Sequence, residues 1–195
     1  MPIIRAPGAK AYVALLHQRV PEKKAQHAIF VAEFVSSFAE RVGVDHDLAV
    51  TAGLLHDLCR TLENEEMLRR ARAYGIVVQP WHEAKPNLLH GPVAAEEIRR
   101  ELAVDDPDVY DAVYWHTTGR PRFCRLGQAL YVADFAEPTR DYAEAARTRE
   151  LLRREGFEAA LRYAAEARLR FHRDTAVLDP TSAAFHAWVE EEFGA

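Results

Sequence analysis

The sequence predicts an all-α fold, a single bundle of helices. Apolar residues recur at intervals of three and four along most of the 195-residue chain, which is the spacing of one helix face. Capping residues and prolines mark where helices begin, and glycines mark where several of them end. Since the sequence contains no repeat, no low-complexity tract and no linker, we expect one domain spanning residues 1–195.

The first expected helix begins near His27 and runs for about four turns. Its apolar residues form one stripe, made of Phe30, Val31, Phe34, Val35, Phe38 and Val42. His27 lies on this stripe, so we expect its imidazole to face the core.

A second helix is expected from about Asp47, as its N-cap, through Cys59. Small residues occupy the face that also carries His56, namely Ala49, Ala52 and Gly53. Small side chains let a neighbouring helix approach closely. A third helix at 63–74 has glutamates near its start and arginines near its end, as the helix dipole favours.

The segment 75–92 is expected to be a loop, because Pro80, Pro86 and Gly91 interrupt it. Pro92 then occupies the first position of a helix that continues through Leu102. His90 is expected just outside the N-terminus of this helix, a position that favours anion binding.

Two further helices each carry a polar residue on the inner face. Asp106 caps the first, which ends at Gly119 and has His116 on its inner stripe. The second, at 126–137, has Asp134 where a hydrophobic residue is expected.

The C-terminal part is expected to be helical as well. Two amphipathic helices at about 141–154 and 157–172 are followed by a last helix after "DPTS". These helices complete the all-α chain.

Composition excludes several classes of protein. With 49% hydrophobic and 28% charged residues, the chain is neither disordered nor membrane-spanning. The run "AYVALL" is too short to cross a bilayer and "MPIIRAPGAK" lacks the features of a secretory leader, so we expect a cytoplasmic protein with no membrane partner. The net charge of −5 argues against a nucleic acid polymer as partner. Cys59 and Cys124 lack the spacing of a disulfide framework or zinc site and are expected to be buried thiols.

Six polar residues are predicted at inward or helix-end positions, namely His27, His56, Asp57, His90, His116 and Asp134. One inward histidine is commonly a hydrogen-bonded core residue, and one inward aspartate is commonly a cap or an ion-pair partner. Six together need another explanation, because an uncompensated buried carboxylate is strongly destabilising. A shared cation removes that cost. The ligand set suits iron, manganese or cobalt, leaves zinc open, and has enough donors for two divalent ions.

The order of these six residues resembles the HD-domain superfamily of metal-dependent phosphohydrolases. The stretches "LLHD", "LLHGPVAA", "YWHTTGRP", "YVADFAEPTR" and "LDPTSAAFHAW" resemble more closely the bacterial symmetrical bis(5'-nucleosyl)-tetraphosphatases, the YqeK-like proteins. They extend from about residue 27 to residue 190, and "HTTGRP" with "ADxxEPxR" is far more specific than "HD" alone. The resemblance implies an HD core at about 27–140, with a metal site between helices, and C-terminal helices at about 141–195.

The resemblance also implies the chemistry. One metal would be held by His27, His56, Asp57 and Asp134, and Asp57 would bridge to a second metal held by His90 and His116. Iron is the metal that the resemblance implies. A hydroxide between the metals would attack diadenosine tetraphosphate at its middle and release two ADP. The expected catalytic residues are Asp57, His90 and Arg60.

Basic and hydroxyl side chains near the ligands are expected to bind the polyphosphate, since the guanidinium fork suits phosphate oxygens. The expected substrate contacts are Arg60, Thr117, Thr118, Gly119, Arg120, Glu137 and Arg140. Alternatives remain for some of them. The hydroxyls of the two threonines can instead form hydrogen bonds at the end of their helix. Gly119 is expected in a turn whether or not it contacts the substrate. Glu137 can either orient a metal ligand or form an ion pair with Arg140.

Two features depart from the pattern of many relatives. Ala25 and Gln26 precede His27 where a basic residue is usual, and Arg60 replaces a lysine. These departures leave the nucleoside preference open. Trp81 is expected either to stack on a base or to pack in the core, as is Tyr114.

Two other functions remain open. One is an HD phosphohydrolase that acts on another nucleotide or phosphate ester, such as a nucleotide 5'-phosphate or a guanosine alarmone. The other is a noncatalytic nucleotide or metal sensor, for which a lost ligand is expected, whereas all six ligand types are present. The sequence leaves the oligomeric state open, a homodimer included.

Overall fold

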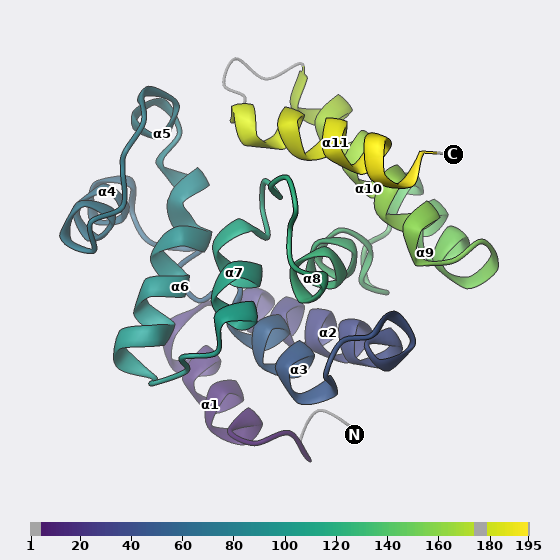
Figure 1. The fold of residues 1–195 in the computed structure, drawn as a ribbon. Helices are drawn as coiled ribbons and strands as arrows, with labels where there is room; N and C mark the ends of the chain where they lie inside the picture. Colours follow the sequence, from purple (N-terminus) through teal and green to yellow (C-terminus); the bar gives the residue numbers. More distant parts are fainter. Residues whose placement is uncertain (1–4, 174–178, 195) are drawn as a thin grey trace.

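The computed structural model describes residues 5–173 and 179–194, and helices make up most of these ranges (Figure 1). No strand occurs within them, which confirms the all-α prediction. The α-helices are α1 (Ala9–Arg19), α2 (Glu22–Phe38), α3 (His46–Leu55), α4 (Asn64–Ala73), α5 (Pro80–Ala84), α6 (His90–Glu101), α7 (Pro107–Trp115), α8 (Arg125–Ala136), α9 (Ala143–Arg154), α10 (Phe157–Arg173) and α11 (Pro180–Phe193). Two 3₁₀ helices, η2 (Glu40–Val42) and η3 (Pro86–Leu89), connect some of them.

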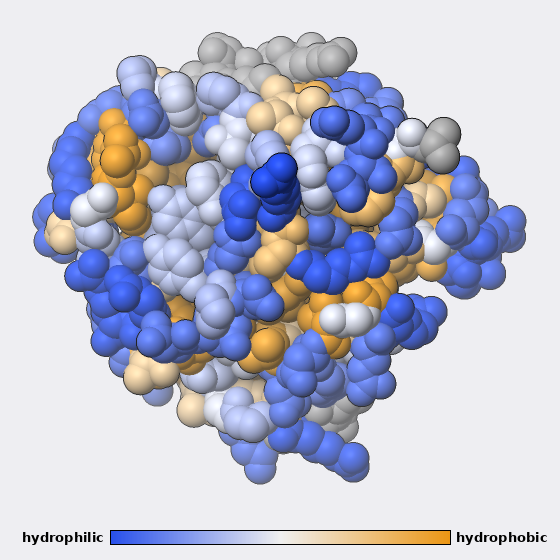
Figure 2. Space-filling view, in the orientation of Figure 1, coloured by the Kyte–Doolittle hydropathy of each residue, from blue (hydrophilic) through white to orange (hydrophobic). Residues whose placement is uncertain are grey.

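The helices α2, α3, α7 and α8 pack against one another and form the centre of the bundle. The helix α6 lies along α7, and α1 packs on α2 and α3. The helix α10 packs on α8, α9 and α11, so the C-terminal helices gather on one side of the bundle (Figure 1). None of the described helices combines the length and the apolar character needed to cross a membrane. The face shown in Figure 2 is mostly hydrophilic, with hydrophobic side chains in separate patches.

The small residues of α3 allow α2 to approach closely, as the sequence predicted. A Cβ atom added to Gly53 would lie 2.6 Å from the Cα atom of Ala32. That distance is shorter than any real contact of this kind, so only glycine fits there. The close approach brings the end of α3, where His56 follows, beside His27 on α2.

The boundaries of α3 differ from the sequence prediction. Its N-cap is Asp45 rather than Asp47, because the side chain of Asp45 accepts the backbone N–H groups of Asp47 and Leu48. The helix ends at Leu55 instead of continuing through the cysteine, and residues 56–61 form turns. Arg60 therefore lies in the turns that follow the helix.

The segment 75–92 also differs from the predicted loop, since it contains α5 and η3. Because η3 leads directly into α6, His90 is the first residue of that helix and not a residue outside it. Pro92 is consequently the third residue of α6, still within the first turn, where proline is tolerated. Helix α1 was not predicted from the sequence, and α2 begins at Glu22 instead of at His27 as predicted.

Candidate metal centre and adjoining cavity

The six predicted ligand residues come together where the central helices meet. Their positions are on α2 for His27, directly after α3 for His56 and Asp57, at the start of α6 for His90, directly after α7 for His116, and on α8 for Asp134. Two groups have donor atoms that all lie within 4.8 Å of one another, namely His27 with His56 and Asp134, and His56 with Asp57 and His116. The fold thus brings residues that are distant in sequence into one cluster.

Three of the histidines are oriented in the same way, since each places Nδ1 against the backbone carbonyl three residues earlier. The pairs are His56 with Gly53 at 2.8 Å, His90 with Asn87 at 2.6 Å, and His116 with Val113 at 2.8 Å. A carbonyl oxygen can only accept, so Nδ1 carries the proton in each ring. Each Nε2 atom is therefore left with a lone pair that faces the cluster.

This arrangement fits a bound cation. The Nε2 atoms of His90 and His116 lie 3.0 Å apart, and their two lone pairs face each other. The Nε2 atom of His56 is buried without a hydrogen-bond partner, 3.7 Å from an oxygen of Asp134 and 3.9 Å from one of Asp57. Imidazole nitrogens together with carboxylate oxygens suit a divalent transition metal, which satisfies all of these lone pairs at once.

His27 is held by a carboxylate instead of a carbonyl. Its Nδ1 atom lies 3.3 Å from Oε1 of Glu137, and its Nε2 atom lies 3.0 Å from Oδ1 of Asp134. Glu137 is buried and also accepts the N–H and the hydroxyl of Thr139. A carboxylate on the outer nitrogen of a histidine fixes the ring and makes it a stronger ligand. Glu137 thus lies on the side of His27 that faces away from Asp134. It does not line the cavity that is described below.

The ionisation states also fit metal ligands. Burial alone would raise the pKa of Asp57, yet the surrounding imidazoles, His56 first, hold it well below its ordinary value. Burial acts in the same way on Asp134, whose pKa is nevertheless held well below the ordinary value by Arg168 and then His27. Burial lowers the pKa of His56 to about 4. Near neutral pH the carboxylates are ionised and this imidazole is neutral, as metal binding requires.

A cavity of about 890 Å³ opens onto the cluster and is lined by both Asp57 and Asp134. Its basic lining residues are Lys24, Arg60, Lys85, Arg140, Arg168 and Arg170, and Glu144 adds one acid. Arg60 approaches Asp57 with Nε at 3.9 Å, and Arg140 approaches Asp134 with Nη2 at 3.4 Å. A cavity with this many cations suits a ligand that carries several negative charges.

Comparison with known proteins identifies the family. A model of the HD domain matches residues 25–175, which is most of the chain. The chain belongs to the HD-domain family. The match reaches beyond the expected HD core at 27–140 and includes α9 and α10. Membership confirms that the chain is an HD-domain phosphohydrolase, and HD domains depend on metal ions.

Curated relatives confirm the narrower resemblance to symmetrical bis(5'-nucleosyl)-tetraphosphatases. The protein of that name from Bacillus subtilis is 33% identical over 141 residues, which cover 71% of this chain and 74% of the relative. The one from Staphylococcus aureus is 32% identical over 126 residues, covering 65% and 64% of the two chains. One similar crystal structure is that of a Clostridium acetobutylicum protein described as a predicted HD superfamily hydrolase involved in NAD metabolism. It superimposes with a TM-score of 0.88 at 24% sequence identity, over 94% of this chain and 97% of that one. This last likeness shows the HD-domain fold.

Four basic residues that line the cavity were not identified in the sequence, and two of them, Lys24 and Arg168, contact the carboxylates of the cluster. Lys24 lies one turn before His27 on α2, with Nζ 3.9 Å from Asp57. The position of Lys24 three residues before His27 could have identified it, because residues three apart lie on the same face of a helix. Arg168 on α10 is largely buried, donates to Asp134 at 2.7 Å and lies over the ring of Tyr131 at 4.4 Å. Nothing in the sequence separates Arg168 from the other arginines of its amphipathic helix.

The predicted substrate contacts fall into two groups in this HD domain. Arg60, Thr117 and Arg140 line the cavity over the cluster. The hydroxyl of Thr117 lies 3.2 Å from the Nε2 atoms of both His90 and His116. These three side chains are therefore positioned to meet a ligand there.

The other predicted contacts do not line that cavity. Arg120 donates through Nε to Asp111 at 2.8 Å. Gly119 has φ of 66° and lies so close to Phe185 on α11 that a Cβ atom would be 2.2 Å from its ring, which explains the glycine by conformation and packing. Thr118 donates to the carbonyl of Gly119. A substrate role for these residues stays a prediction.

Proposed function

We propose that this enzyme hydrolyses diadenosine tetraphosphate symmetrically and releases two ADP. One observation carries the proposal: imidazole lone pairs and two carboxylates converge at a cavity lined by six basic side chains. Curated relatives bear the name of this activity. The cavity volume of about 890 Å³ is within the range of roughly 300–1,000 Å³ that is typical of small-molecule sites.

We propose further that the site holds two divalent metal ions, iron in the first place and manganese or cobalt as alternatives. His27, His56, Asp57 and Asp134 would hold one ion, and Asp57, His90 and His116 the other. Such ions supply Lewis-acid stabilisation of phosphoryl oxygens and a water that ionises near neutral pH.

The remaining side chains bind and orient the substrate. Arg60, Lys24 and Arg140 face the cluster from the cavity wall, where they counter the charge of the phosphates and of the departing ADP. Thr117 offers a hydroxyl beside the cluster. Glu137 keeps the ring of His27 in place from behind, which makes it a positioning residue.

The test is an anaerobic assay of purified protein loaded with iron or manganese. Diadenosine tetraphosphate is the substrate, the products are resolved by chromatography, and the metal content is counted on the same sample. ADP as the sole nucleotide product, with about two ions per chain and loss of activity on chelation, is the expected result.

Two other outcomes contradict the proposal in different ways. ATP together with AMP means an asymmetric cut and a different placement of the substrate. No turnover despite two bound ions means that another phosphate compound is the substrate, or that the protein is a sensor.

A further inference from the structure

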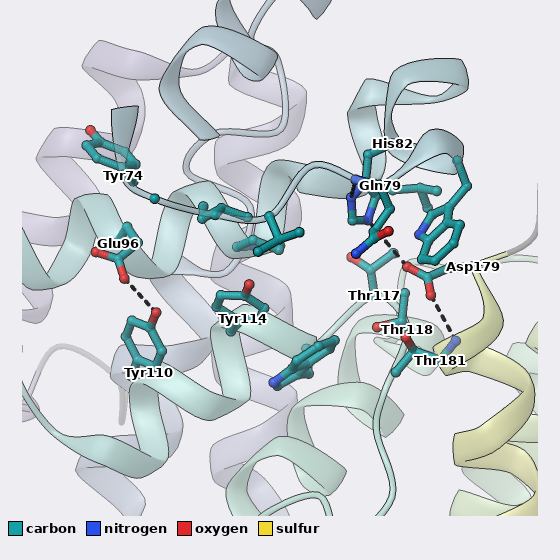
Figure 3. Close-up of a pocket in the computed structure, with 17 residues that line it drawn as sticks. Tyr74, Gln79, His82, Glu96, Tyr110, Tyr114, Thr117, Thr118, Asp179 and Thr181 are labelled. Carbon is teal, nitrogen blue, oxygen red and sulfur yellow. Dashed lines mark hydrogen bonds and ion pairs between the residues drawn. The ribbon is translucent and has the colours of Figure 1, made fainter. Parts of the chain in front are cut away.

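A second cavity, of about 390 Å³, adjoins the one over the metal cluster. Thr117 and Leu88 line both cavities, so the two meet beside the ligands His90 and His116. The second cavity lies between α6, α7, the segment 74–82 and the start of α11 (Figure 3). His82 of α5 and Asp179, the N-cap of α11, approach to 3.6 Å and close one end of it.

The lining of this second cavity is rich in aromatic side chains, namely Tyr74, Trp81, Tyr110, Tyr114 and Trp115. Figure 3 shows the three tyrosines toward one end and His82 with Asp179 at the other. The indole nitrogen of Trp81 is buried and has no hydrogen-bond partner among the described residues. A buried donor without a partner is unfavourable, and an acceptor on a ligand would relieve it. Flat aromatic ligands with ring acceptors are the class that such a lining suits.

The charges of the two cavities differ. Among the described residues that line the second cavity none is lysine or arginine, and two are acidic, Glu96 and Asp179. The first cavity has six basic lining residues. Cations that could bind a phosphate chain thus line the first cavity and not the second. Carboxylates do suit ribose hydroxyls, which donate to them in nucleotide sites.

Both carboxylates also have existing partners. Glu96 accepts from Tyr110 at 2.7 Å and from two arginines outside the cavity. Asp179 accepts the N–H of Thr181 at 2.8 Å. Because a carboxylate has about four lone-pair positions, each can accept a further hydroxyl without losing these contacts.

We propose that the second cavity binds one nucleoside of a dinucleoside polyphosphate, with the base among the aromatic side chains and the phosphate chain passing Thr117 to the metal cluster. The path of the phosphates rests on the proposed function, whereas the nucleoside site itself does not. The division of aromatic and basic linings between adjoining cavities matches a ligand with an aromatic end and an anionic middle.

The test uses adenosine, which carries no phosphate, and the metal-free protein. Two of the three tryptophans, Trp81 and Trp115, line the cavity, whereas Trp188 stacks on Phe185 and lies outside it. We expect adenosine to quench the tryptophan fluorescence in a saturable way. In Trp81→Leu the affinity for adenosine falls about 10-fold or more, as loss of a stacking partner predicts. Trp81→Phe keeps a ring and recovers part of the loss, and Trp188→Phe binds as the wild type does.

A second titration distinguishes the two cavities in the wild-type protein, so it does not depend on a variant that folds. Inorganic tripolyphosphate should bind without displacing adenosine, and Trp81→Leu should bind tripolyphosphate as tightly as the wild type. Displacement of adenosine by tripolyphosphate would place the nucleoside in the first cavity and overturn the proposal. Absence of saturable adenosine binding to the wild type would overturn it as well.

Turnover separates this proposal from the proposed function. If diadenosine tetraphosphate is hydrolysed, Trp81→Leu should lower kcat/KM about 10-fold, in line with its loss of adenosine affinity. Hydrolysis with an unchanged kcat/KM in Trp81→Leu would overturn the nucleoside site and leave the proposed function standing. Adenosine binding without any hydrolysis of diadenosine tetraphosphate would support the nucleoside site and contradict the proposed function.

Discussion

The Oδ2 atom of Asp134 lies 2.7 Å from Nη2 of Arg168, and this contact ties a predicted metal ligand on α8 to helix α10. The other oxygen of Asp134 lies 3.0 Å from Nε2 of His27. The carboxylate is therefore shared, with one oxygen fixed by the guanidinium and one directed toward the cluster. The family match extends through residue 175 and so includes α10.

Arg168→Met should weaken metal binding and destabilise the protein. The change leaves Asp134 without its cation, and breaking such a buried pair costs about 3–5 kcal/mol. Loss of an outer partner typically lowers metal affinity about 10- to 100-fold. Metal affinity by competition with a chelator and Tm by calorimetry measure both effects. Arg162→Met on the same helix, where a half-exposed pair with Glu190 is lost, should change either property little, and equal effects in the two variants would contradict the role of Arg168.

Asp57→Asn should abolish turnover while the helices persist. Asparagine keeps the shape of the side chain but cannot supply a charged ligand, so the loss should exceed the roughly 100-fold that removal of an outer partner costs. Steady-state kinetics and far-UV circular dichroism are the measurements. Asp47→Asn, in the exposed first turn of α3, is the matched control and should keep full activity. Ordinary activity in Asp57→Asn would mean that the two-metal mechanism is wrong.

Metal loading should raise the thermal stability. An ion that binds only the folded chain stabilises it by about 2.7 kcal/mol when its free concentration is 100 times Kd. For a chain of this size the corresponding rise in Tm is about 5–11 °C. Calorimetry with manganese and with a chelator measures it. The same shift in Asp57→Asn would show that the ion binds elsewhere.

Arg140→Ala should impair the enzyme far more than Arg120→Ala does. Arg140 lines the cavity over the cluster, and loss of a charge-assisted hydrogen bond costs about 1.5–3 kcal/mol. Arg120 pairs with Asp111 outside that cavity, so kcat/KM should stay within a few-fold of the wild type. Kinetics with diadenosine tetraphosphate compare the two variants. A large loss of kcat/KM in Arg120→Ala would mean that Arg120 does contact the substrate.

Neither cysteine should react readily with alkylating reagents in the native protein. Burial raises the pKa of Cys59 far above its ordinary value and that of Cys124 to about 12. Thiolate, the reactive form, is therefore scarce at neutral pH. Mass spectrometry after iodoacetamide at pH 7.5 should find both thiols intact, and both modified once the chain is unfolded. Cys124 is only partly buried, unlike the sequence expectation, so any slow labelling should begin there.

Much of the fold was predictable because the helices carry regular apolar stripes. The stripe from Phe30 to Phe38 identified α2, and the polar residues on inner faces identified the cluster of candidate ligands. The errors arose where local signals compete. The sequence "GVDHD" offers two aspartates as caps, and only the backbone geometry selects Asp45. In the segment 75–92 the prolines obscured α5 and η3, because proline marks helix starts as well as loops.

The clustering of the six candidate ligands was predictable from the sequence, and the surroundings of the cluster were less so. Ligand types are rare on inner helix faces, and this made His27 and Asp134 conspicuous. Arginine is common on amphipathic helices, so the burial of Arg168 is visible only once α10 packs on α8. The pairing of Arg120 with Asp111 likewise depends on tertiary structure.

The contacts of His56, His90 and His116 with the carbonyl three residues earlier separate two tasks in the assembly of the site. Each contact lies within one turn of the chain, so a ring acquires its tautomer and its direction as soon as that turn forms. The distances between the rings depend instead on how the helices dock, above all where Gly53 meets Ala32. A substitution that shifts the docking would therefore leave the three imidazoles with the right tautomer and direction, but too far apart to form one metal site together. Metal affinity should consequently report on the spacing of the helices more sensitively than helix content does.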